Sequence, residues 1–334
     1  MDFTAFKHSI FNLQSLFEFN EIARSLFRYQ YNNNKFYRSF VDALGVSESK
    51  VYHPEQIPFL PVSFFKTHKI VTGDLTEEVV FESSGTTGMD TSRHYVADTE
   101  LYEQSFTKGL ELFYGDLSKY VIFALLPSYL ERKNSSLVYM VEKLLLKSDR
   151  QMGGFFLNNL EALQQQLTEA RRLGLKIMLF GVTFALLDMA ENFPVKIPDA
   201  IIIETGGMKG RRKELTRMEL HGQLCKSFGV SKIHSEYGMT ELLSQAWSSG
   251  DGIFRCPPWM KVMIADTNDP LSFLETGRSG GINIIDLANF HSCSFISTQD
   301  LGRVFKDEST GAESFEVLGR FDNSDIRGCS LLAT

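Results

Sequence analysis

The chain has 334 residues, of which 43% are hydrophobic and 22% are charged, and its formal net charge is −7. A chain of this length forms one large domain or two unequal ones, and it buries enough surface to fold without disulfide bonds. The acidic balance and the lack of any block of Lys and Arg argue against a nucleic-acid-binding protein, which would carry a basic surface.

The sequence of the first 88 residues predicts helices, a connector and a short strand. Apolar residues recur at helical spacing through the first 44 residues, and Gly45 closes that segment. Residues 53–61 contain three prolines and are expected to be extended. A strand at 79–81 then leads into the turn-forming run 83–88.

Residues 98–235 alternate between helix and strand patterns, which is typical of a parallel sheet covered on both faces. The expected helices are 98–114, 135–147, 159–173, 183–192 and 212–227, and the expected strands are 120–126, 153–157, 176–180, 200–204 and 231–235. Later the helices stop, and short strands are expected at 260–265, 281–286, 293–297, 301–305 and 314–318. We therefore predict a doubly wound α/β region at 1–250, a smaller strand-rich subdomain at 251–322 and a tail at 323–334.

The cysteines and the apolar segments predict a cytoplasmic protein. The cysteines lie at 225, 256, 293 and 329, and no CxxC pair marks a zinc ribbon or a redox motif. The start of the chain lacks the basic and apolar segments of a secretion signal. The longest apolar run, 177–187, is far shorter than the ~18 residues that span a bilayer, so no membrane span is expected.

Phenylalanine is unusually frequent, with 28 residues against 11 tyrosines and 2 tryptophans. Two interpretations are open: a Phe-rich core, or a large apolar ligand pocket.

The run Ser83-Ser84-Gly85-Thr86-Thr87-Gly88 has the composition of an anion-binding loop. Its glycines let successive backbone N–H groups converge on one point, and its hydroxyls add donors suited to phosphate. No Gly-Lys-Ser/Thr closes the run, so it is not a Walker-type loop. An ordinary solvated loop has the same composition, so this run alone does not decide between the two.

Further motifs lie at expected strand ends, where ligands bind in open α/β sheets. Glu204-Thr205-Gly206-Gly207 ends one strand, and residues 234–241 follow another. In the second motif Tyr237 could cover a base, Thr240 could reach a phosphate, and Glu241 could hold Mg²⁺ through oxygen.

Asp300 and Arg320 belong to two later motifs. Asp300 ends the run Ser297-Thr298-Gln299-Asp300, and a carboxylate that leaves a strand can bind both hydroxyls of a ribose. Arg320 follows in Leu318-Gly319-Arg320-Phe321-Asp322.

Four of these motifs, at 83–88, 237–241, 300 and 319–320, in this order resemble the signature set of the adenylate-forming superfamily of acyl-CoA synthetases, luciferases and non-ribosomal adenylation domains. The resemblance implies the N-terminal-domain fold of that superfamily, with ATP and Mg²⁺ as cofactors. It further implies the following roles: the ATP phosphates for Ser83, Ser84, Gly85, Thr86, Thr87 and Gly88; adenine for Gly206, Gly207 and Tyr237, with Gly238 in the same motif; phosphate for Thr240; Mg²⁺ for Glu241; and ribose for Asp300 and Arg320.

The sequence departs from that superfamily in three places. It ends twelve residues after Asp322, so we expect the protein to work without the C-terminal lid domain and its lysine. The phosphate loop lacks its usual lysine, and Gln299 replaces a usual glycine. The cation that compensates the transition-state charge is left open among four candidates, Lys66, Arg93, Lys209 and Arg327.

The runs 57–66 and 319–331 resemble the acyl-protein synthetase of bacterial luminescence (LuxE family), and this resemblance covers nearly the whole chain. It implies activation of a fatty acid as acyl-AMP, a thioester on a cysteine near the C-terminus, and transfer to an acyl reductase partner. Cys329 matches that cysteine, and Arg327 nearby would favour its thiolate. An incidental tail cysteine is the alternative.

Two other hypotheses are open. The chain could be a lidless acyl-CoA or aryl-CoA ligase, which only the tail cysteine distinguishes from an acyl-protein synthetase. It could also be a non-catalytic nucleotide-binding subunit, although Glu241 and Asp300 count against this. His234, which directly precedes the nucleotide motif, is either a general base for a thiol or a buried structural histidine.

Overall fold

The computed structural model describes residues 2–83, 91–126, 134–149, 152–156, 159–206 and 215–321, and one mixed sheet of twelve strands runs through them. The strand order is β11-β12-β13-β14-β10-β9-β8-β7-β6-β4-β5, with β1 attached to β13. The strands are β1 Leu60–Pro61, β4 Tyr120–Leu125, β5 Gly154–Phe155, β6 Lys176–Val182, β7 Ile201–Thr205, β8 His234–Tyr237, β9 Ala246–Ser248, β10 Ile253–Arg255, β11 Met260–Ala265, β12 Ser279–Asp286, β13 Phe295–Lys306 and β14 Glu313–Arg320. A separate hairpin consists of β2 Val79–Glu82 and β3 Arg93–Val96.

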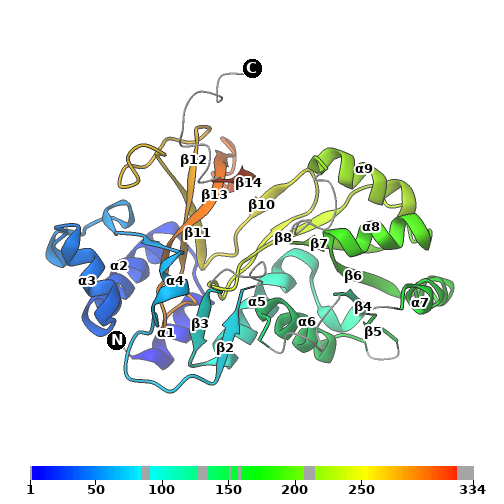
Figure 1. The fold of residues 1–334 in the computed structure, drawn as a ribbon, viewed down its shortest axis with the longest axis horizontal. Coiled ribbons are helices and arrows are strands. Elements are labelled where there is room, and N and C mark those ends of the chain that lie inside the picture. The colour runs from blue at the N-terminus through cyan, green and yellow to red at the C-terminus, as the bar shows by residue number, and fades with distance from the viewer. Residues whose placement is uncertain are drawn as a thin grey trace.

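The parallel half of the sheet is covered on both faces. Strands β5, β4, β6, β7 and β8 are parallel, and β6 is buried along all but its first residue. Helices α5 and α6 lie below these strands in Figure 1, and α8 and α9 lie above them. The helices are α1 Phe3–Ile10, α2 Leu16–Asn33, α3 Lys35–Ala43, α4 Phe64–Thr67, α5 Thr99–Tyr114, α6 Ser136–Lys147, α7 Leu160–Arg172, α8 Thr183–Asn192 and α9 Arg217–Phe228. The predicted doubly wound α/β fold is confirmed.

The strand order reverses between β4 and β6, which defines where a ligand can bind. From β4 the chain passes outward to β5, and it then returns to β6, β7 and β8 on the other side of β4. Ligands of open α/β sheets bind beyond the carboxyl ends of the strands at such a reversal. The predicted motifs after β7 and β8 lie at this edge.

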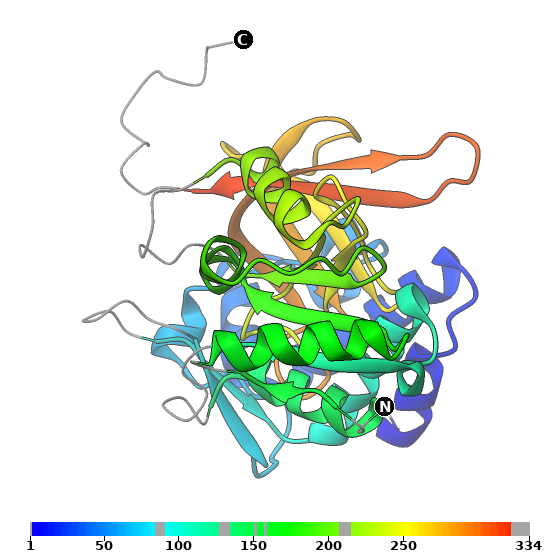
Figure 2. The same ribbon diagram turned by 90° about the vertical axis from the view of Figure 1, so that its right-hand side faces the viewer.

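The strand-rich part of the chain extends the same sheet. Strand β9 is antiparallel to β8, and β10 is antiparallel to both β9 and β14. In Figure 2 the long β13–β14 hairpin, in orange and red, lies above the green parallel strands. The expected strands 293–297 and 301–305 are one strand, β13, because the chain passes Leu301 and Gly302 with a shift in register rather than a turn.

The N-terminal segment forms the three helices α1, α2 and α3, which end before Gly45 as the helical pattern predicts. Ser15 begins α2 by accepting a hydrogen bond from the Glu18 amide, and Asn34 ends α2 and caps α3 through the Tyr37 amide. These helices pack aromatic rings against the sheet, and Phe27 lies 6.2 Å from Phe295 between ring centroids. The phenylalanines buried here and under the sheet support the interpretation of a Phe-rich core.

The proline-rich connector is only partly extended. Residues Pro54–Gln56 form a single 3₁₀ turn, because the Gln56 side chain accepts hydrogen bonds from the backbone amides of Tyr52 and His53. The chain then pairs as β1 in parallel with β13, which brings α4 to the ligand edge of the sheet. Within the residues described, no helix is long and apolar enough to cross a membrane.

Candidate active site

Tyr237 and Asp300 meet at the carboxyl edge of the sheet although 63 residues separate them. The Tyr237 hydroxyl donates to Asp300 Oδ2 at 2.8 Å. The Tyr237 ring packs against Phe254 and Phe315, with centroids 5.8 and 5.4 Å away. Burial and the Asp300 carboxylate both raise the pKa of Tyr237 well above its usual value, so the phenol stays protonated and donates.

Arg320 faces Asp300 across the β13–β14 pair. The two residues are directly opposite in the ladder, and Arg320 Nε lies 3.3 Å from Asp300 Oδ1. The Arg320 side chain is 79% exposed, so this ion pair contributes at most about 1 kcal/mol. The guanidinium can therefore exchange this carboxylate for a bound ligand at little cost.

Glu241 is a buried carboxylate with two cations nearby. Its residue is 5% exposed, and burial raises the pKa of its carboxyl. A hydrogen bond from the Ser92 hydroxyl and the charges of Arg320 and Lys66 act in the opposite direction. Burial outweighs these contributions, so the pKa of the Glu241 carboxyl is raised overall.

Lys66 reaches this site through the connector. Val62 donates its backbone N–H to the Ser297 carbonyl at 2.8 Å, and α4 begins two residues later. Phe65 is buried and packs edge-on against His94 at 5.9 Å, which leaves Lys66 exposed beside the site. Of the four candidate cations, Lys66 is the one among the described residues whose charge lowers the pKa of Glu241, whereas Arg93 forms an exposed ion pair with Glu82 at 3.3 Å. Lys209 and Arg327 lie outside the described residues.

The buried carboxylate of Glu236 lies where β7 and β8 end, and the sequence motifs did not predict it as a site residue. Glu236 accepts a hydrogen bond from the Thr205 hydroxyl, and burial raises its pKa to about 7, with a smaller contribution from the Glu204 charge. A Cβ at Gly238 would lie 2.3 Å from a Glu236 carboxylate oxygen, so a larger residue at position 238 would displace the Glu236 side chain. The only sequence signal for Glu236 was its position beside Tyr237.

Gly206 follows β7 with a φ of 70°, a conformation that favours glycine. Its carbonyl lies 2.5 Å from the Thr183 hydroxyl at the start of α8, so the turn after β7 is tied to the neighbouring helix. Gly207 lies outside the described residues.

Ser83 closes the base of the β2–β3 hairpin. Its backbone N–H donates to the Ser92 carbonyl at 3.0 Å, and its side-chain oxygen accepts from the Ser92 N–H at 2.9 Å. The other predicted phosphate-binding residues, Ser84, Gly85, Thr86, Thr87 and Gly88, and the predicted nucleophile Cys329 lie outside the described residues.

His234 has the environment of a structural histidine. It is buried at the amino end of β8, away from Tyr237, and its Nδ1 lies 3.1 Å from the Tyr114 hydroxyl. Burial lowers its pKa to about 4, so it stays neutral near pH 7. These contacts support the structural interpretation over that of a general base.

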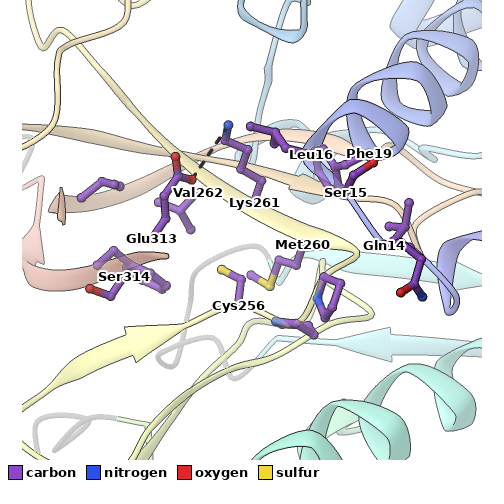
Figure 3. A pocket seen from close by; sticks show the side chains of 15 residues that line it. Gln14, Ser15, Leu16, Phe19, Cys256, Met260, Lys261, Val262, Glu313 and Ser314 are labelled. Atoms are coloured by element: carbon purple, nitrogen blue, oxygen red, sulfur yellow. Dashed lines mark ion pairs between the residues drawn. The ribbon is translucent and has the colours of Figure 1, made fainter. Parts of the chain in front are cut away.

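A groove of about 370 Å³ borders the site through the Phe315 ring (Figure 3). It lies between the start of α2 and strands β11 and β14, and an ion pair of 3.9 Å between Lys261 and Glu313 crosses it. Cys256 also lines the groove, and burial raises the pKa of its thiol. None of the predicted site residues that the structure describes lines this groove.

In the described residues no three His, Cys, Asp or Glu side chains are grouped so that they could hold a metal ion. A single carboxylate such as Glu241 nevertheless fits Mg²⁺, which takes its remaining ligands from phosphates and water.

Solved structures of adenylate-forming ligases share this fold. A 2-hydroxyisobutyryl-CoA ligase in an open conformation with 2-HIB-AMP and CoA matches with a TM-score of 0.68 and 13% identity, over 92% of this chain and 70% of its own. The ATP-bound MatB of Rhodopseudomonas palustris matches with a TM-score of 0.54 and 17% identity, over 74% of this chain and 49% of its own. The fold is therefore that of an adenylate-forming ligase.

The family model for the acyl-protein synthetase LuxE matches residues 4–334, so the chain belongs to the LuxE family and is an ATP-dependent acyl ligase. Two curated relatives are long-chain-fatty-acid–luciferin-component ligases. The Vibrio harveyi protein is 24% identical over 332 residues, covering 93% of this chain and 86% of the relative. The Aliivibrio fischeri protein is 23% identical over 337 residues, with the same coverage.

Proposed function

We propose that this ligase converts a fatty acid and ATP into acyl-AMP, holds the acyl group as a thioester on Cys329, and passes it to a partner protein such as an acyl reductase. The observation that carries the proposal is the convergence of Tyr237, Asp300 and Glu241 at the carboxyl edge of the sheet. These residues come from two distant motifs, and each has the chemistry that its part of a nucleotide requires.

The two steps balance as follows. A carboxylate oxygen of the fatty acid attacks the α-phosphorus of ATP, the bond to the bridging oxygen breaks, and pyrophosphate leaves. The thiolate sulfur of Cys329 then attacks the acyl carbon, the bond to the AMP oxygen breaks, and AMP leaves. The first step converts a poor leaving group into a good one, and the second preserves the activation.

We assign the site residues by their chemistry. Asp300 and Arg320 bind the ribose, and Tyr237 lies against adenine with Gly206, Gly207 and Gly238. Thr240 contacts phosphate, Glu241 binds Mg²⁺, and residues 83–88 hold the phosphates. Bound Mg²⁺ would supply positive charge at the phosphates.

Lys66 is the cation that we assign to the phosphates. Lys66→Met should lower kcat/KM for ATP by about 10- to 100-fold, because a charge-assisted hydrogen bond contributes about 1.5–3 kcal/mol. Steady-state kinetics with ATP as the varied substrate measures this. Lys69→Met is the matched control, because Lys69 lies three residues away and pairs with Glu77 at 2.9 Å. An unchanged kcat/KM for ATP in Lys66→Met would remove Lys66 from the site.

The names of the two relatives, both long-chain-fatty-acid–luciferin-component ligases, and the family resemblance support a fatty acid as substrate. Exchange of pyrophosphate into ATP should require an acid, and its kcat/KM should rise with chain length by about fourfold per CH₂ until the pocket is full, since each buried CH₂ contributes ~0.8 kcal/mol. A panel from acetate to long-chain acids, with an acid-free control, measures this. Preference for acetate or an aromatic acid would contradict the assignment. Absence of exchange with every acid tested would favour a non-catalytic subunit.

A lidless acyl-CoA ligase is the alternative, and it shares the first step.

The described cysteines, Cys225, Cys256 and Cys293, are free thiols, which supports the proposed cytoplasmic location.

A further inference from the structure

Buried side chains from other segments hold the turn that carries Thr240 and Glu241. The ladder between β8 and β9 ends at the pair Tyr237 and Ala246, and the residues between them form the turn. The Asp286 carboxylate accepts hydrogen bonds from the backbone N–H groups of Leu243 and Ser244, at 2.8 and 3.0 Å.

Buried side chains also bind the two backbone carbonyls at the centre of this turn. Asn289 Nδ2 donates to the Glu241 carbonyl at 2.8 Å, and His94 Nδ1 lies 2.9 Å from the Thr240 carbonyl. His94 and Asn289 are both buried and come from segments that are far apart in the sequence. The conformation of the turn is therefore set by tertiary contacts.

The protonation of His94 follows from its surroundings. Burial lowers its pKa to about 4, so the ring is neutral near pH 7, and the Thr240 carbonyl can only accept. The ring proton must therefore be on Nδ1. His94 Nε2 is buried and has no hydrogen-bond partner among the described residues. The bond from Nδ1 is thus the polar contact that distinguishes this histidine from an apolar residue of similar size.

Strand β3 links His94 to two other groups of the site. The Ser92 hydroxyl, just before β3, lowers the pKa of the Glu241 carboxyl, and Phe65, next to Lys66, packs edge-on against the His94 ring. The segment Ser92–His94 therefore interacts with the Thr240–Glu241 turn through two side chains and with the lysine-bearing helix α4 through one.

We propose that His94 is a positioning residue for adenylation, whose Nδ1–H holds the Thr240 carbonyl and thereby sets Thr240 and Glu241 in register with Ser92 and Lys66. This inference rests on the proposed function. Adenylation depends on the placement of charged groups, and a displacement of ~1 Å can cost about 100-fold in rate. His94 itself transfers no proton.

Substitutions that place an amide at either ring nitrogen test this inference. In His94→Asn the side-chain amide occupies the place of Nδ1, whereas in His94→Gln it occupies the place of Nε2. We expect His94→Asn to retain acid-dependent pyrophosphate exchange within a few-fold of wild type. His94→Gln and His94→Leu should lose about 10- to 100-fold in kcat, with KM for the acid unchanged. The matched control is His291, which is half-buried beside the same small cavity as His94 and should show no difference between Asn and Gln.

Thermal unfolding gives the folded fraction by which every rate is normalised. Should the His94 variants fail to fold, Ser92→Ala tests the same strand contact, and its exchange rate should fall about tenfold with wild-type stability. Equal rates for His94→Asn and His94→Gln, or an unaffected Ser92→Ala, would overturn the inference while leaving the proposed function intact. A wild-type protein without exchange for any acid would overturn both.

Discussion

Cys329→Ser should abolish the acyl-protein adduct and leave acyl-AMP formation nearly unchanged. The residues that we propose for adenylation, 83–88, 237–241 and 300, do not include the thiol. A serine hydroxyl is a far weaker nucleophile without a dedicated base, and an ester on it would resist onward transfer. Intact mass after incubation with ATP, Mg²⁺ and a fatty acid should show the wild-type adduct, which hydroxylamine releases, and no adduct in the variant.

The other cysteines provide the controls for that experiment. Cys225→Ala and Cys256→Ala should retain the adduct, because burial raises the pKa of both thiols and disfavours the thiolate. Cys293→Ala should retain it as well, since this thiol is buried and its hydrogen bond goes to the Phe295 carbonyl. An adduct that persists in Cys329→Ser, or acyl-CoA released by this variant at the wild-type rate, would favour the acyl-CoA ligase.

Glu241→Gln should lower Mg²⁺-dependent pyrophosphate exchange by about 100-fold or more. A neutral amide is a poor Mg²⁺ ligand, and loss of even an indirect contact to a metal typically costs 10- to 100-fold. The variant should be at least as stable as wild type in thermal unfolding, because burial raises the pKa of Glu241 and the amide removes the cost of burying a charge.

Glu241 also gives the activity a predictable pH dependence. Its carboxylate must be ionised to bind Mg²⁺, and burial raises its pKa, so exchange should decline on acidification at a higher pH than an exposed glutamate would produce. Added Mg²⁺ should shift this decline to lower pH, because the metal competes with the proton. Glu100→Gln, which alters an exposed ion pair with Lys7, is the control and should have wild-type exchange. An exchange rate in Glu241→Gln within a few-fold of wild type would exclude Glu241 as the metal ligand.

Local patterns in the sequence predicted most of the parallel half of the fold. The expected helix 183–192 coincides with α8, and the expected strand 260–265 coincides with β11, because both have apolar patterns long enough to show their period. Strands β9 and β10 were missed because three residues carry no such pattern. Strand β9 pairs with β8, and β10 pairs with β14, so the two short strands join both parts into one continuous sheet. The strand β14 that pairs with β10 is far from it in the sequence, which leaves no local signal for this pairing.

The sequence by itself determined the class of protein, because the order of its motifs resembles that of the adenylate-forming superfamily. Tyr237, Glu241, Asp300 and Arg320 were predicted in this way. Tyr237 ends β8 and Arg320 ends β14, whereas Asp300 lies within β13 and does not leave a strand as expected. The contact of His94 with the turn after β8 and the effect of the Lys66 charge on Glu241 depend instead on tertiary structure. Residue 94 meets residue 240 only because the β2–β3 hairpin packs against that turn, and the position of α4, which carries Lys66, follows from the pairing of β1 with β13. Such contacts join side chains to backbone groups far away in the sequence, so neither local propensity nor spacing carries a signal for them.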